Sequence, residues 1–274
     1  LSDQQASAFS AEVRAIRALF YYYAMDMFGR IPIVTSYNVN LKQVVQNERS
    51  EVFRFIFNEL QAVAPLLADE HSNIRGDYYG RVTRPVANFL LAKLALNAEV
   101  YTVDNWTSGS RQNGKNIFFH VNGEKKNAWE TCIWYCEQLR QEGYELENDY
   151  ASNFAVHNES SKENIFTIPL DKNLYPNEYH YLFRSRHYQH GGAYGGASEN
   201  GTCATISTVK AYGYATDHVD NRFYTNFYAD TVFVDGKKVY LDNGEPLVYR
   251  PLELKLNLSA SPYKQTAGAR VAKY

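Results

Sequence analysis

Apolar residues recur at intervals of three and four through the first half of the chain, and this spacing constrains that half to helices. The first apolar stripe consists of Phe9, Val13, Ile16, Phe20, Tyr23 and Met27. An α-helix has 3.6 residues per turn, so residues at these intervals lie on one of its faces. Gly29 and Pro32 follow as stop signals, which predicts a long first helix that ends near them.

Two further helices are predicted between residues 50 and 101. Ser50 can cap the first of them, and Pro65 should end or kink it, because proline lacks the amide hydrogen that a helix interior needs. Its apolar stripe is Phe53, Ile56, Leu60, Val63 and Leu67. Thr83 can cap the next helix, with Pro85 in the first turn, where proline is tolerated. The apolar face of this helix is Ala87, Leu90, Leu91, Leu94, Ala98 and Tyr101.

A fourth helix is predicted after residue 126. Asn127 and Glu130 have the spacing of a capping box, and Gly143 should close the helix. The helix carries Trp129, Cys132, Ile133, Cys136 and Leu139. Helices of about 15–20 residues joined as antiparallel pairs are typical of helical repeats. We therefore predict a mainly α fold, with a tetratricopeptide-like α-solenoid core over residues 1–150 and an insertion at 102–126.

The pattern changes after residue 150, where Gly, Asn, Ser and Tyr dominate and apolar runs are short. The run 165–168, after a polar turn at 158–161, is predicted to be a short buried strand. Residues 231–240 have the pattern of a β-hairpin with Asp235-Gly236 at its turn, and 247–249 adds a third strand. Residues 151–274 are thus predicted to be a loop-rich region with a small antiparallel meander. We expect this region to pack on the helices as part of one structural unit.

Composition excludes several classes of function. The formal net charge of −2 does not suggest the basic face that nucleic-acid binding needs. The sequence has no run of 18 apolar residues that could span a membrane. Residues 1–5 lack the features of a signal peptide, so any export signal is expected to have been removed or to lie outside this chain. Three cysteines do not make a disulfide framework.

Several segments, in the same order along the chain, resemble motifs of the SusD/RagB family, which are cell-surface glycan-binding lipoproteins of Gram-negative bacteria. The matching segments are 11–22 (A-E-x-R-x-x-R-A-L-x-Y), 28–34 (F-G-x-x-P-x-V), 80–83 with 90–94 (G-R-x-T…L-L-A-K), 163–166 (E-x-I-F), the glycine-rich 195–201 and 220–222 (D-x-R). The chain departs from the family at Pro85-Val86. It also has no lipidated N-terminal cysteine and no late R-Y-A-D helix. The chain therefore resembles a central fragment, truncated at both ends.

The resemblance implies non-catalytic capture of an oligosaccharide or polysaccharide, with no cofactor. It implies a location at the outer membrane, exposed on the cell surface, through a lipid anchor that lies outside this chain. It also implies a partner, a SusC-like TonB-dependent transporter that receives the glycan. Two alternatives stay open, a helical-repeat scaffold that binds protein and a glycan-cleaving enzyme.

Sugar recognition needs a flat aromatic surface together with fixed hydrogen-bonding groups. The chain has 23 tyrosines, and many lie with polar residues in the glycine-flanked stretch 175–201. The candidate glycan-binding residues are Tyr175, Tyr188, His190, Tyr194, Glu199 and Asn200, with Trp106 as a further stacking platform. The alternative is that these tyrosines pack over the helices and that Trp106 covers an edge of the core.

No catalytic residue and no metal site are predicted. The spacing of His180, His187 and His190 fits no compact ligand set, and Cys132 with Cys136 suits a pair of core thiols. Calcium could be held by Asp217, Asp220 and Asp230 with Asn221 and Asn226. Their spacing is not that of an EF-hand, and calcium binding stays open. Glu159, Glu163 and Glu199 have no recognisable catalytic setting for the enzyme alternative.

Overall fold

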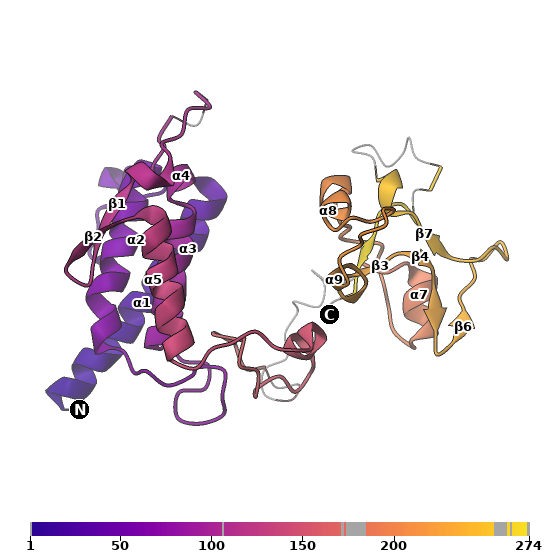
Figure 1. Cartoon of the computed structure of the whole chain (residues 1–274), viewed down its shortest axis with the longest axis horizontal. Coiled ribbons are helices and arrows are strands. Elements are labelled where there is room, and N and C mark those ends of the chain that lie inside the picture. The colour runs from indigo at the N-terminus through magenta and orange to yellow at the C-terminus, as the bar shows by residue number, and fades with distance from the viewer. Residues whose placement is uncertain are drawn as a thin grey trace. The chain divides into compact units, whose positions relative to one another are not determined.

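A computed structural model gives the fold of two compact units. It describes residues 2–105, 107–170, 173, 185–254, 262–263 and 265–272. Unit 1 comprises Leu1–Asn148 and His157–Pro169, and unit 2 comprises Asp149–Val156 and Leu170–Tyr274. Figure 1 shows long helices in the first unit and short elements in the second. Among the described residues, no helix has the length and hydropathy to cross a bilayer.

Unit 1 is a stack of helices. They are α1 (Asp3–Phe28), α2 (Arg49–Val63), α3 (Arg84–Leu96), the short α4 (Ala98–Tyr101) and α5 (Ala128–Gln141). α1 packs on α2, α2 on α3, and α3 on α5 (Figure 1). Short 3-10 helices lie at Leu41–Gln43, Ala64–Leu66 and Gly114–Asn116. The insertion before α5 holds an antiparallel hairpin of β1 (Phe118–Val121) and β2 (Glu124–Asn127), which the sequence did not predict.

The predicted ends and buried faces of α2 and α3, and the predicted cap of α5, are largely confirmed. α2 ends at Val63, just before Pro65, and its whole predicted stripe is buried. Thr83 is the N-cap of α3, although its side chain makes no capping hydrogen bond, and the predicted α3 face is buried. The capping box of α5 is present, with Asn127 and Glu130 each accepting the other's backbone N–H.

Two predictions were wrong, the residue that caps α2 and the residues on the buried face of α5. Ser50 does not cap α2, since the N-cap is Glu48. The Ser50 hydroxyl instead donates to the Asp104 carboxylate at 2.8 Å. On α5, Ile133 and Cys136 are exposed, so this pair of cysteines is not a pair of core thiols. The core face of α5 consists of Ala128, Thr131, Tyr135 and Leu139.

The first helix packs with the face opposite to its most apolar stripe. The side chains of α1 that are buried are Ala11, Ala15, Ala18, Tyr22 and Met25. The stripe by which the sequence identified this helix is exposed from Phe9 to Met27. Alanines let a neighbouring helix approach closely, and interaxial distance depends on the side chains at the contact. The small-residue face therefore meets α2, and the large stripe does not.

The predicted strand at 165–168 is also wrong. These residues have no strand structure, and Ile168 is exposed. Ile165 and Phe166 are partly buried against the helical core of unit 1. The segment then passes close to Gly80, where a Cβ would lie 2.5 Å from Pro169 Cδ and where φ is +75°. The segment is thus held by packing on the helices without a strand partner.

Unit 2 combines short helices with two-stranded sheets. The helices of its described residues are α7 (Tyr188–Ala193), α8 (Ile206–Ala211) and α9 (Arg222–Asn226), with 3-10 helices at Tyr150–Phe154 and Pro251–Glu253. Antiparallel pairs join β3 (Phe227–Tyr228) to β8 (Arg270–Val271), β4 (Asp230–Thr231) to β7 (Val248–Tyr249), and β5 (Phe233–Val234) to β6 (Lys237–Lys238). Small cores form around Leu247 and Tyr249 and around Phe223.

The predicted hairpin is confirmed. Asp235 and Gly236 form its turn between β5 and β6, with φ of +50° and +74°. The third predicted strand is β7, and it pairs with β4, the start of the first strand segment. The predicted packing of residues 151–274 on residues 1–150 stays a prediction.

Candidate functional site

Three side chains of unit 2 form what we call the Tyr194 platform: Arg186, Tyr194 and Tyr228. The guanidinium carbon of Arg186 lies 5.3 Å from the ring centroid of Tyr194 and 5.3 Å from that of Tyr228, within the range of a cation–π contact. Tyr194 follows the last residue of α7 and is 52% exposed. The platform therefore offers an aromatic side chain to solvent next to a planar cation.

Two buried side chains, those of His190 and Tyr249, support this platform. His190, on α7, is fully buried, and its Nδ1 lies 3.0 Å from the Tyr249 hydroxyl. Its ring centroid lies 4.6 Å from that of Tyr228 and 5.5 Å from that of Tyr194. Burial, with Arg186 and His187 nearby, lowers the pKa of His190 to about 4. The imidazole is therefore neutral at pH 7 and packs as an uncharged ring beneath the exposed tyrosine.

A buried arginine holds together the segments that carry the platform. The Arg270 guanidinium donates to the carbonyl oxygens of Gln265 at 2.8 Å, Ser185 at 3.3 Å and Gly201 at 3.4 Å. Its central carbon also lies 5.6 Å from the ring centroid of Tyr249. Ser185 precedes Arg186, so these bonds fix the start of the platform relative to the strands behind it.

The other predicted residues take different places. The Tyr188 hydroxyl donates to Asp242 at 2.8 Å, and its ring is partly exposed. The backbone N–H of Asn200 donates to the Arg186 carbonyl oxygen at 3.0 Å, which brings Asn200 beside the platform. Glu199 is exposed in the same turn. Tyr175 and Trp106 lie outside the described residues.

The sequence prediction missed three residues around this platform. Tyr228 lies in β3, Asp242 in the turn before β7, and the fully buried Tyr249 in β7, all far along the chain from α7. The signal that could have found them is the tyrosine surplus, which continues through these strands. Tyr249 was assigned to a strand from its pattern alone, and Tyr228 precedes the predicted strands, so neither was connected with the loop at 188–200.

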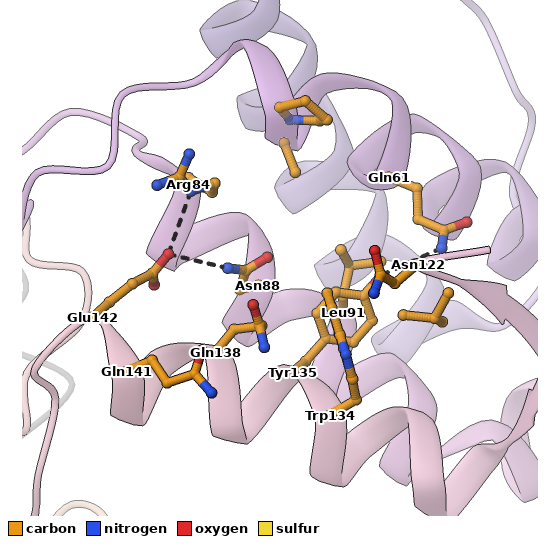
Figure 2. Close-up of a pocket in the computed structure, with 13 residues that line it drawn as sticks. Gln61, Arg84, Asn88, Leu91, Asn122, Trp134, Tyr135, Gln138, Gln141 and Glu142 are labelled. Atoms are coloured by element: carbon orange, nitrogen blue, oxygen red, sulfur yellow. Dashed lines mark hydrogen bonds and ion pairs between the residues drawn. The ribbon is translucent and has the colours of Figure 1, made fainter. Parts of the chain in front are cut away.

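A second concave surface lies in unit 1, and no sequence motif pointed to it. Figure 2 shows this pocket, of about 530 Å³, between α2, α3, α5 and the turn of the β1–β2 hairpin. Five of its lining residues carry carboxamides: Gln61, Asn88, Asn122, Gln138 and Gln141. The Trp134 indole and the Tyr135 ring also line it. The pocket thus places amide groups beside aromatic side chains.

One end of the pocket is charged. Arg84 Nε lies 3.3 Å from Glu142 Oε1 in an ion pair, and Asn88 donates to the same oxygen at 3.5 Å (Figure 2). Burial nevertheless raises the pKa of Glu142. Its Oε2 is buried and has no hydrogen-bond partner among the residues that the structure describes. The pocket thus combines neutral amides, an indole and a partly satisfied carboxyl group. It can hydrogen-bond a polar ligand and pack against its apolar side.

Comparisons with known proteins fit this architecture. No family model matches the chain. Over 171 residues, 57% of the chain, it is 31% identical to the starch-binding protein SusD of Bacteroides thetaiotaomicron, and the match spans 29% of that protein. The chain matches the crystal structure of a SusD-like protein from Bacteroides fragilis over its whole length, with a TM-score of 0.64 and 17% identity. It covers 52% of that structure.

A second solved structure gives the same result. The chain matches a protein crystallised with xylogluco-oligosaccharide over its whole length, with a TM-score of 0.63 and 17% identity, and covers 47% of it. The chain thus spans about half the length of these structures. The fold is a tetratricopeptide-like α-solenoid with a loop-rich second unit. The chain thus has the fold of SusD-like proteins, and over 57% of its length it is similar in sequence to SusD.

Proposed function

We propose that the chain is part of a protein that binds oligosaccharides or polysaccharides without cleaving them. The observation that carries this proposal is the 31% identity to a starch-binding protein, in a chain that also presents an exposed tyrosine platform. We further propose that the protein is exposed on the cell surface at the outer membrane and held there by a lipid anchor outside this chain. It delivers its glycan to a SusC-like TonB-dependent transporter.

The Tyr194 platform is the proposed sugar site. The apolar face of a pyranose packs on the exposed ring of Tyr194, and Arg186 donates hydrogen bonds to hydroxyl groups at its edge. Tyr188, Glu199 and Asn200 supply further polar groups on the same stretch of chain. His190 acts from below by holding the tyrosine rings in place. Tyr175 and Trp106 remain proposed stacking residues.

The pocket of unit 1 is proposed as a second sugar contact. Trp134 supplies a ring for stacking, and the amides of Gln138 and Gln141 can each donate to and accept from hydroxyl groups. This combination suits a neutral polyhydroxylated ligand better than a charged one, because most of the polar lining is uncharged.

The surroundings of two candidate carboxylates support a binding protein over an enzyme. A glycosidase needs an acid with a raised pKa and a second carboxylate facing it. Glu159 has a lowered pKa, chiefly because its carboxylate accepts its own backbone N–H, and it pairs with Arg75 at 2.9 Å. Glu163 accepts the backbone N–H of Glu147 at 3.0 Å. The lowered pKa of Glu159 does not suit a general acid, and the Glu163 carboxylate is engaged with the backbone.

Calorimetry with purified glycans tests the proposal. Maltoheptaose, laminarin oligosaccharides and xylogluco-oligosaccharides are the probes, and a reducing-end assay checks for turnover. Replacing Tyr194 with Ala should weaken binding several-fold, since aromatic packing contributes on the order of 1 kcal/mol. Tyr240→Ala is the matched control, because Tyr240 is 53% exposed in the same unit but lies off the platform.

The outcomes separate the two sugar contacts. Trp134→Ala reports on the pocket in the same way, and Trp134→Phe should keep most of its binding. If binding persists unchanged in both Tyr194→Ala and Trp134→Ala, the sugar site lies elsewhere. If the folded protein binds none of a broad glycan panel, the proposed function is wrong. Turnover that is lost on replacing Glu159, Glu163 or Glu199 would instead establish an enzyme.

A further inference from the structure

The exposed stripe of α1 is unusual for a surface helix. We call it the α1 seam, and it consists of Phe9, Val13, Ile16, Phe20, Tyr23 and Met27. These six large apolar side chains are all exposed along a single helix, and Phe20 is 69% exposed. Single exposed apolar residues need no explanation, but a contiguous stripe marks an interaction surface.

The spacing of the seam identifies the shape of its partner. The intervals are four, three, four, three and four residues, which is the 3.5-residue repeat of a coiled-coil seam. Such a stripe is narrow and straight, and it packs against another helix by inserting side chains between those of its neighbour. From Phe9 to Met27 the seam is about 27 Å long, since a helix rises 1.5 Å per residue. A partner helix of about 18–20 residues matches that length.

The opposite face of α1 shows that this helix is built to be packed on both sides. Its buried residues, from Ala11 to Met25, follow the same alternation of four and three and face the core of unit 1. Terminal helices of a solenoid normally present a polar outer face to solvent. α1 instead has the two apolar faces of a helix in the middle of a stack.

Charged side chains beside the seam already have partners within unit 1. Glu12 pairs with Arg81, Arg17 pairs with Glu59 at 2.6 Å, and Asp26 accepts a hydrogen bond from Tyr101 at 2.6 Å. These contacts satisfy the charges on either side of the stripe. A partner therefore needs a neutral apolar stripe and no complementary charge.

We propose that the α1 seam is covered by a helix of the same polypeptide that lies outside residues 1–274. The solved structures that contain the whole fold of this chain are about twice its length, because the chain covers 52%, 47% and 50% of them. The fold therefore has as much chain again from which such a helix can come. An intramolecular helix is also held at high effective concentration, which a second copy of the chain is not. This inference does not depend on glycan binding.

Thiol labelling on α1 tests the proposal. Phe20→Cys places a thiol in the seam, and Phe28→Cys is the matched control, because Phe28 is 73% exposed on the same helix but off the stripe. Each variant is made in residues 1–274 and in the complete gene product, and maleimide labelling is followed by peptide mapping. The native thiols are resolved by the same mapping.

We expect both introduced thiols to react at similar rates in residues 1–274. In the complete gene product, labelling at position 20 should slow by roughly ten-fold or more, because it then requires local opening. Labelling at position 28 should change little. The protection should be the same at nanomolar and at micromolar protein concentration.

Two results would overturn the proposal. Equal labelling rates at position 20 in both forms would show that no further helix covers the seam. Protection that disappears on dilution would assign the seam to a second copy of the chain. If Phe20→Cys impairs folding of the complete gene product, Val13→Cys is a smaller change at another seam position and gives the same readout.

Discussion

Lowering the pH from 7 to 5 should destabilise unit 2, because His190 is buried there as a neutral ring. The pKa of an unfolded histidine is about 6.5, and burial beside Arg186 and His187 lowers that of His190 to about 4. The unfolded state therefore binds the proton first as the pH falls, and stability is lost from pH 6.5 downwards. Between pH 7 and 5 the loss is about 2 kcal/mol, at 1.36 kcal/mol per pH unit.

Hydrogen exchange resolves this effect by region. The three tryptophans, at positions 106, 129 and 134, all fall within the range of unit 1, so unit 2 has no tryptophan of its own. Peptides from residues 185–254 report on it directly. After correction for intrinsic rates, their slowest amides should open about 30-fold more often at pH 5 than at pH 7, the ratio that 2 kcal/mol implies.

Two variants assign the effect to one histidine. His190→Asn should remove most of the pH dependence, leaving the smaller contribution of His187, whose pKa is lowered chiefly by burial. His218→Asn should leave it unchanged, since that side chain is exposed in the same unit. An NMR titration of His190 with a midpoint near 6.5 would refute the reasoning, as would protection in unit 2 that is the same at both pH values.

Two further predictions concern the stability of unit 1, and both are read by urea denaturation with tryptophan fluorescence. Leu94→Ala, at a fully buried position of α3, should cost about 2–5 kcal/mol, and Leu90→Ala should behave alike. Leu96→Ala, at an exposed position of the same helix, should cost little, so equal midpoints for all three variants would contradict the assigned face. Asn127→Ala should cost about 1 kcal/mol by removing the α5 cap, and an unchanged midpoint would show that the cap contributes nothing.

The helices were predictable because their signals are local. The stop at Pro65, the start at Thr83 and the capping box at Asn127 all act within one turn of helix, so neighbouring residues suffice to place them. The hairpin at Asp235-Gly236 is similar, since its turn needs two residues with positive φ. The segment 165–168 differs, because a strand exists only through its partner and no local pattern supplies one.

The candidate site was only partly predictable, for the same reason. Tyr188, His190 and Tyr194 are close in sequence, so a tyrosine-rich loop with flanking glycines pointed to them. Their burial was not visible. His190 is enclosed because Tyr228 and Tyr249 arrive from strands far along the chain. The sequence could therefore name the loop but could not separate a side chain that faces solvent from one that supports it.

The orientation of α1 shows most clearly what hydropathy cannot decide. The helix has two apolar faces, and by side-chain hydrophobicity the stripe from Phe9 to Met27 is the stronger. The core nevertheless takes the face that begins at Ala11, because small side chains allow α2 to approach closely along the whole contact. Which face the core takes depends on the shape of the neighbouring helix, and the local sequence does not contain that shape. The large side chains remain exposed on the other face, and the labelling of position 20 measures whether a further helix covers them.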